Sequence, residues 1–286
     1  MNLSTLLTLI DDSDATVEEQ LSRYYLTEIS SEKVIELESV KDKINPHRLN
    51  FYHNLHRSMK MTWFESCLDK IIENPSVENI HNIENILLAM NAFFPDLHSV
   101  NKSKNDLRQL TDEIRDRIIP IADLHLKLLE ISQVLYHNHQ FGGNSKSYYD
   151  ILNSDFSHVL ESKHGIPISL SMMTFIICRN LNIPCIPANI PRHFMLYFPS
   201  DQPVYMDCFN AGNLLSPDDL TDFLTYLHIE KPLQNYHEEN FLIVLKRWFQ
   251  NMAFIYTNQN DEESMSRIQP SVNKINHHLN GFDETE

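Results

Sequence analysis

The chain has 286 residues and 42% hydrophobic content, enough for one large or two small units with a packed core. Its 23 Lys and Arg residues face 39 acids, and the formal charge of -16 repels phosphate backbones, so we expect no nucleic-acid partner. No apolar run approaches the roughly 18 residues of a membrane span, and no basic flank precedes the N-terminal apolar stretch, so we expect no membrane partner and a cytoplasmic location.

Residues 1–75 are predicted to form an N-terminal helical region. A short helix is expected at the start, a second after Asp14, and a third over residues 30–43, before Pro46. The longest helix, residues 47–73, carries aromatic and methionine side chains at helical spacing. That pattern favours a packed face over a ligand site.

Helical patterns continue to about residue 135. A helix is predicted for residues 77–94, a polar loop for 95–105, and a helical stretch for 106–135. Pro120 is expected to kink the last stretch or to divide it into two helices.

The composition changes after residue 135: four of the five glycines lie between residues 142 and 212. Glycine concentrated in one region indicates backbone that needs a positive φ or a close approach. Residues 168–181 are apolar on almost every side, which predicts a buried helix. Short β-like segments follow at 183–190, 193–198 and 204–209, separated by proline turns. A buried helix leading into antiparallel strands predicts an α+β fold that is mostly helical.

The C-terminal part is predicted to be helical again, then loose. Ser216 and Pro217 read as an N-cap and the first position of a helix. Residues 239–256 form a strongly apolar helix, whereas the stretch from about residue 258 is polar and acidic. We expect that last stretch to lack fixed structure.

Short ordered blocks between residues 136 and 220 carry a family resemblance. They are FGGN (141–144), YYD (148–150), NS (153–154), VLE (159–161), GIPISL (165–170), PRHF (191–194) and DCFNAG (207–212). The segment resembles the SirB-type branch of the transglutaminase-like superfamily. The resemblance implies a papain-like core over residues 76–225, with a central buried helix packed on a small antiparallel sheet. It also implies a C-terminal segment, 226–286, that begins as a truncated tetratricopeptide-like end.

The resemblance further implies a catalytic arrangement of three side chains. In active members a cysteine starts the central helix, a histidine activates it, and an aspartate orients the histidine. His193 and Asp207 occupy the last two positions, and we expect them to be neighbours across adjacent strands. The cysteine position falls on Pro167, or on Ile168 with one residue of slippage.

Other residues are candidates for the site or for binding. Ser169 is the hydroxyl nearest the cysteine position, although serine in a first helical turn favours a cap over a nucleophile. Arg192 stands where the family commonly has glycine, and it either covers the site or binds an anionic group. We also predict that Asn144 and Tyr149 contribute to binding.

The spacing of the cysteines and histidines predicts no metal site and no other cofactor site. The four cysteines have no C-x-x-C spacing and indicate reduced thiols; they are Cys67, Cys178, Cys185 and Cys208. The closely spaced histidines lack metal-site spacing and favour surface or capping roles; they are His53 and His56, and His137 and His139. We therefore expect no metal and no other cofactor.

Three functions remain open from the sequence. The first is a non-catalytic transglutaminase-like protein with a binding or regulatory role and another protein as its partner. The second is a hydrolase or acyltransferase with Ser169, His193 and Asp207 as a triad. The third is a helical adaptor whose partner docks on the N-terminal helices.

Overall fold

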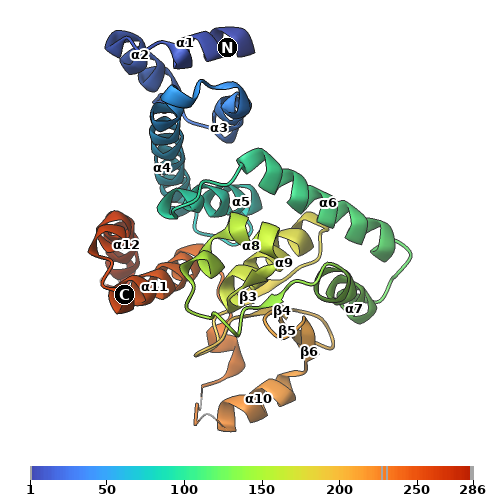
Figure 1. The fold of residues 1–286 in the computed structure, drawn as a ribbon. Coiled ribbons are helices and arrows are strands. Elements are labelled where there is room, and N and C mark those ends of the chain that lie inside the picture. Colours follow the sequence, from blue (N-terminus) through green and yellow to red (C-terminus); the bar gives the residue numbers. More distant parts are fainter. Residues whose placement is uncertain (1, 227, 230, 284–286) are drawn as a thin grey trace.

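A computed structural model describes residues 2–226, 228–229 and 231–283 (Figure 1). The fold is α+β and predominantly helical, as predicted, with one small antiparallel sheet at its centre. No helix within the described part of the chain is long and apolar enough to cross a bilayer.

Four helices make up the N-terminal region. They are α1 (Leu3–Asp11), α2 (Ala15–Leu26), α3 (Ser31–Glu38) and α4 (Leu49–Glu73). Asp14 and Ser30 accept backbone N–H groups in the first turns of α2 and α3, so side-chain caps fix where both helices begin. Helix α3 ends earlier than predicted, and the chain continues through two short 3₁₀ turns, η1 (Lys41–Lys43) and η2 (Pro46–Arg48). Helices α1 to α3 gather at one end of α4, and the rest of the molecule lies at the other (Figure 1).

The middle of the chain adds helices around the core. They are α5 (Ile80–Ala89), η3 (Met90–Phe93), α6 (Val100–Ile118), α7 (Leu124–Ser132) and η4 (Gln133–Asn138). Helix α6 begins inside the stretch predicted as loop, because the Ser99 side chain accepts the Lys102 N–H and caps it. The break expected at Pro120 is present between α6 and α7.

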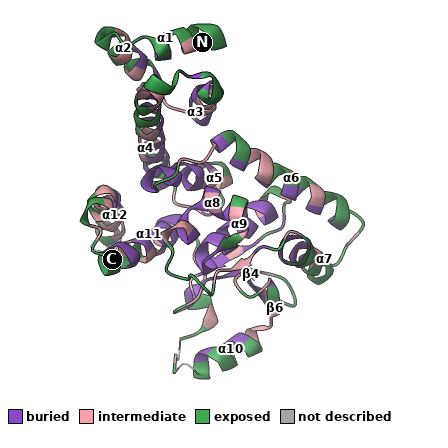
Figure 2. Ribbon diagram, viewed as in Figure 1, coloured by how far each residue is buried: buried purple, intermediate pink, exposed green. Residues whose placement is uncertain are grey.

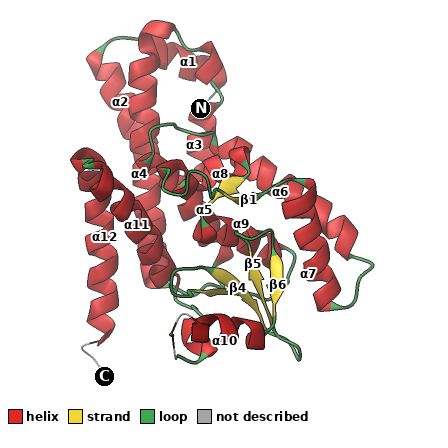
Figure 3. Ribbon diagram, turned by 60° about the horizontal axis from the view of Figure 1, so that its bottom comes forward, coloured by secondary structure: helices red, strands yellow, loops and turns green. Residues whose placement is uncertain are grey.

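The sheet lies between two helices. Strands β3 (Ile186–Ala188), β4 (Met195–Phe198), β5 (Val204–Asp207) and β6 (Asn213–Leu215) pair antiparallel in that order. Helix α9 (Pro167–Asn180) covers one face and is buried along nearly its whole length (Figure 2), as its apolar sequence predicted. Helix α10 (Pro217–Tyr226) packs on β5 and β6 from the other side (Figure 3).

Shorter elements join the helical part to the sheet. They are the parallel pair β1 (Gly142–Gly143) and β2 (His164–Gly165), the turn η5 (Ile151–Ser154), helix α8 (Phe156–Ser162) and the turn η6 (Leu233–Tyr236). Strands β1 and β2 both contact α9, so the pair holds Gly142 and Gly143 close to this helix.

The C-terminal prediction is partly wrong. Helix α11 (Phe241–Gln259) matches the apolar segment, but the stretch expected to be loose is a second long helix, α12 (Glu262–Asp283). Helix α12 packs against α11 and α4, and it buries Ile268 and Ile275, which lie two turns apart. A single apolar stripe therefore stabilises a helix whose overall composition is polar.

One hydrophobic cluster runs from Leu6 in α1 to Ile275 in α12. A second, smaller cluster lies between the sheet and α10, and it includes Met195, Tyr205 and Leu220. Because the larger cluster crosses all three predicted segments, the division at residues 75 and 225 stays a prediction.

Candidate functional site

His193 and Asp207 lie side by side, as predicted. The Nε2 atom of His193 is 2.8 Å from Oδ2 of Asp207, an ion-pair distance. The ring N–H is not aligned for a hydrogen bond with the carboxylate. Both side chains are largely withdrawn from solvent, with relative exposures of 13% and 8%.

Backbone and amide groups fix the Asp207 carboxylate. Its Oδ1 accepts the N–H groups of Phe209 and Asn210 at 3.2 and 3.1 Å, and its Oδ2 accepts the Asn210 side-chain amide at 2.8 Å. Burial alone would raise the pKa of Asp207, but its contacts with His193 and Asn210 outweigh burial and lower it. The carboxylate is therefore held ionised and in one orientation.

His193 does not open a strand, which corrects the sequence-based interpretation. It lies in the turn before β4, which begins at Met195. Its predecessor Arg192 has a φ of 64°, in the left-handed region that favours glycine. The backbone therefore keeps the conformation of a glycine turn while an exposed cationic side chain occupies the position.

A pocket of about 340 Å³ opens beside the His193 ring. It is lined by side chains from the loop before η5, the first residue of α9, the turns that precede β4 and follow β5, and α10: Tyr148, Pro167, Pro191, Arg192, His193, Phe209, Asn210 and Phe223. Pro167 is the first residue of α9, so the helix N-terminus and the His193 side chain share this pocket. Ile168 is 1% exposed and does not line the pocket, so of the two residues considered for the nucleophile position Pro167 is the one that reaches it.

The Ser169 hydroxyl bonds to backbone groups and not to His193. Its Oγ accepts the Ile166 N–H at 3.0 Å and donates to the Asn153 carbonyl, 2.8 Å away, with the Ile166 carbonyl also close at 3.1 Å. The side chain is fully buried and does not line the pocket. The hydroxyl therefore caps the first turn of α9, and the geometry gives no support to a Ser169–His193–Asp207 triad.

None of the four cysteines reaches the pocket. All are buried, and burial raises the pKa of both Cys67 and Cys208 to about 12. A hydrogen bond with Cys185, together with burial, raises the pKa of Cys178. At neutral pH the thiols of Cys67, Cys178 and Cys208 therefore stay protonated and poorly nucleophilic.

Asn144 and Tyr149, the two further binding candidates, lie in different environments. The Asn144 amide donates to Asn153 Oδ1 at 2.9 Å and its oxygen accepts the Ser147 N–H, so it holds the loop together. Tyr149 is 62% exposed and lies beside the Phe254 ring, 5.7 Å between centroids. Neither residue lines the pocket, whereas the neighbouring Tyr148 does.

One histidine of each closely spaced pair lies beside a glutamate. His56 is buried rather than at the surface, with Nε2 3.0 Å from Glu38 Oε1, and His139 Nε2 lies 2.7 Å from Glu113 Oε2. Among the residues that the structure describes, no group of three or more His, Cys, Asp or Glu side chains could hold a metal ion.

A known family model matches the part of the chain that holds the pocket. A model described as the transglutaminase-like superfamily matches residues 101–248, more than half of the 286-residue chain. The chain belongs to the transglutaminase-like superfamily. The matched region contains α9, the sheet and every residue that lines the His193 pocket.

Curated relatives of this transglutaminase-like chain share part of its length. A UPF0162 protein of Xylella fastidiosa (strain 9a5c) is 26% identical over 205 residues, which cover 69% of this chain and 73% of that protein. A UPF0162 protein of the Temecula1 strain is 29% identical over 146 residues, covering 51% of this chain and 52% of that protein. Human F-box only protein 21 is 29% identical over 151 residues, 50% of this chain but only 24% of that protein. No solved structure gives a significant match.

The sequence-based candidates lack three residues that line the His193 pocket: Tyr148, Phe209 and Phe223. Tyr148 belongs to the YYD block, so that motif points to Tyr148 as much as to Tyr149. Phe223 comes from α10, and no motif or spacing signal links that helix to the pocket.

Proposed function

We propose that this chain is a non-catalytic member of the transglutaminase-like superfamily, of the SirB type, that binds another protein through the His193 pocket. The observation that carries the proposal is the position of Pro167. It lines the pocket together with His193 at the N-terminus of α9, where the family's nucleophilic cysteine is expected.

Acyl transfer by this arrangement requires a thiolate at the helix N-terminus. Proline has neither a thiol nor a hydroxyl, and the nearest hydroxyl, Ser169, is bonded to backbone groups. The orienting pair of His193 and Asp207 persists without a nucleophile to activate. Its remaining role is to shape a polar wall of a binding pocket.

The pocket has features that suit a partner with an acidic group next to apolar side chains. Arg192 is exposed, and its guanidinium can pair with a carboxylate in a bidentate manner. The rings of Tyr148, Phe209 and Phe223 provide apolar surface around it. Tyr148 and Phe223 are 37% and 42% exposed, so the aromatic surface is open to a partner.

The proposal also concerns the C-terminal helices α11 and α12. Helices α11 and α12 pack against each other as a helix pair, the unit from which tetratricopeptide-like arrays are built (Figure 1). We interpret the pair as a truncated tetratricopeptide-like end, and we place the protein in the cytoplasm.

Affinity purification from the source cell tests the proposal directly. The wild-type protein is compared with Arg192→Glu, which reverses the charge at the pocket, and with Lys70→Glu, the same change at an exposed position on α4. We expect at least one protein in near-stoichiometric amount that Arg192→Glu loses and Lys70→Glu keeps. Identical sets of proteins from all three baits would contradict binding through the pocket.

A further inference from the structure

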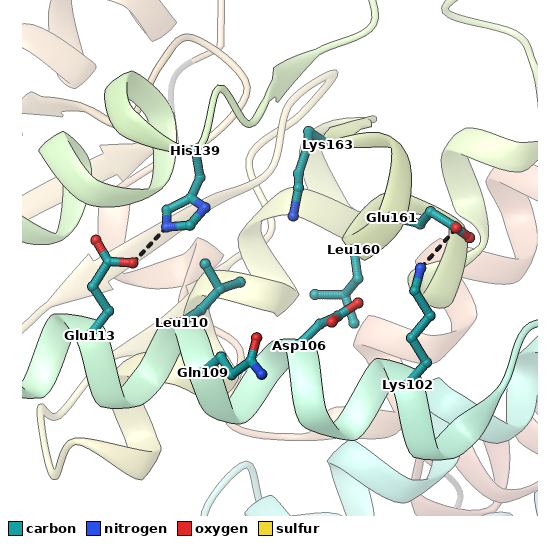
Figure 4. A pocket seen from close by; sticks show the side chains of 9 residues that line it. All are labelled: Lys102, Asp106, Gln109, Leu110, Glu113, His139, Leu160, Glu161 and Lys163. Carbon is teal, nitrogen blue, oxygen red and sulfur yellow. Dashed lines mark hydrogen bonds and ion pairs between the residues drawn. The ribbon is translucent and has the colours of Figure 1, made fainter.

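A second pocket lies between α6 and α8, and it shares no lining residue with the His193 pocket. Its volume is about 320 Å³, at the small end of the range for ligand sites. Figure 4 shows charged and amide side chains of both helices around it, with Leu110 and Leu160 as its only apolar lining residues. Such a lining suits a small polar ligand better than an apolar one.

Two acidic side chains in this pocket already have close partners. Glu113 Oε2 lies 2.7 Å from His139 Nε2, and Glu161 Oε1 lies 2.8 Å from Lys102 Nζ (Figure 4). These pairs form the two ends of the pocket. A ligand would gain little by competing for these two carboxylates, because each already has a close partner.

Asp106 and Lys163 differ from those pairs. Their side chains point into the pocket from α6 and from the end of α8 (Figure 4). Neither forms an ion pair with any residue that the structure describes, although the two charges attract each other across the space. Lys163 Nζ lies instead over the Phe141 ring, 4.4 Å from the centroid, where partial burial lowers the pKa of the ammonium group.

The backbone at Lys163 is a second unusual feature. Its φ of 67° is left-handed, at a helix C-terminus where glycine is the residue usually found. A long charged residue at such a position is disfavoured by sterics. It is also the position from which this side chain reaches into the pocket.

We propose that this pocket binds a small zwitterion of the α-amino-acid type, with its carboxylate against Lys163 and its ammonium group against Asp106. A simple anion would face the acidic groups of α6, and a simple cation would face Lys163. A ligand with both charges satisfies both unpaired groups at once. The Gln109 amide and the second ring nitrogen of His139 lie nearby to accept or donate further hydrogen bonds (Figure 4).

Isothermal titration with glycine, L-alanine and L-glutamine tests the ligand class. N-acetyl-L-alanine, which lacks the ammonium group, and L-alaninamide, which lacks the carboxylate, serve as matched control ligands. We expect at least one free amino acid to bind and each blocked analogue to bind at least tenfold more weakly. No binding of glycine, L-alanine or L-glutamine at about 10 mM, roughly ten times a millimolar Kd, would overturn the proposal.

Variants locate the binding. Lys163→Gln and Asp106→Asn each remove one of the unpaired charges and should weaken binding at least tenfold, whereas Lys163→Arg keeps the charge and should retain binding. Lys70→Gln, an exposed position on α4, is the control for charge loss elsewhere. Thermal melts confirm that each variant is folded. Unchanged affinity in both Lys163→Gln and Asp106→Asn would show that the ligand binds at another place.

Discussion

Pro167 and His193 line the same pocket, one at the first position of α9 and the other in the turn before β4. A helix N-terminus facing an imidazole lowers the pKa of a thiol placed between them. This chain keeps both parts of that environment, together with the Asp207 carboxylate that contacts the imidazole. Under the proposal, Pro167, whose ring carries no nucleophilic atom, stands at the position of the nucleophile.

Gly143→Ala and Gly165→Ala should each destabilise the protein by about 1–3 kcal/mol. The clustering of glycines indicated either a positive φ or a close approach, and neither of these two glycines has a positive φ. The reason is close approach: an added Cβ would lie 2.5 Å from the Phe209 ring at Gly143 and 2.6 Å from Ser169 Oγ at Gly165.

Gly142→Ala is the matched control for both glycine variants. A Cβ there meets nothing within 4 Å, so its free energy of unfolding should change by less than about 0.5 kcal/mol. Urea denaturation of the three variants measures the difference. Equal stability of Gly142→Ala and Gly143→Ala would contradict the packing of Phe209 on the loop.

Lys60→Met should destabilise the protein by about 3–5 kcal/mol, the range for breaking a buried ionic network. The Lys60 ammonium is fully buried, 2.8 Å from Asn91 Oδ1 and 3.9 Å from Glu38 Oε1. Methionine fills the space but leaves the Glu38 charge without this cation. Lys70→Met, on the exposed face of the same helix, should change the unfolding free energy by less than about 0.5 kcal/mol in the same urea titration.

Glu238→Gln should change how stability depends on pH. Burial raises the pKa of Glu238 from 4.5 to about 7, so the folded state holds a proton that the unfolded state releases. Ionisation therefore favours unfolding, and this residue's contribution to stability is lost as pH rises from about 4.5 through 7. Glutamine stays neutral and keeps an oxygen for the Asn240 N–H.

The variant should gain about 1–2 kcal/mol over the wild type between pH 4.5 and pH 8, after allowance for partial exposure. Denaturation of both proteins at the two pH values gives this difference directly. A constant offset at both pH values would mean that Glu238 titrates in the folded protein as it does in the unfolded chain.

Arg192→Gly should stabilise the protein by about 1 kcal/mol, because it relieves the left-handed conformation at a φ of 64°. Thermal melts measure the change. A lower melting temperature would mean that contacts of the Arg192 side chain outweigh the backbone strain.

The sequence predicted the parts of the fold in which one pattern dominates. The apolar stretch 168–181 reads as a buried helix because its side chains must be covered on every side, and α9 occupies residues 167–180. Helix α12 was missed because its composition is polar, although Ile268 and Ile275 lie at helical spacing and are buried. Two isoleucines among so many polar residues are a weak signal until their packing partners are known.

The residues of the site also divide into those that the sequence predicted and those that it did not. His193 and Asp207 belong to ordered blocks, so their proximity was predictable from the resemblance. The contribution of Phe223 was not, because α10 reaches the pocket only through its packing on β5 and β6. The bonding of Ser169 to Asn153 also depends on a loop position that no local pattern determines.

The rate of cysteine alkylation by iodoacetamide at pH 7 tests the proposed absence of a nucleophile most directly. We predict that the four cysteines of the wild-type protein react no faster than a free thiol, because all are buried. In Pro167→Cys the new thiol should react at least tenfold faster than a free thiol, and adding His193→Ala should abolish that advantage. A wild-type cysteine that alkylates rapidly, and only when His193 is intact, would contradict the account.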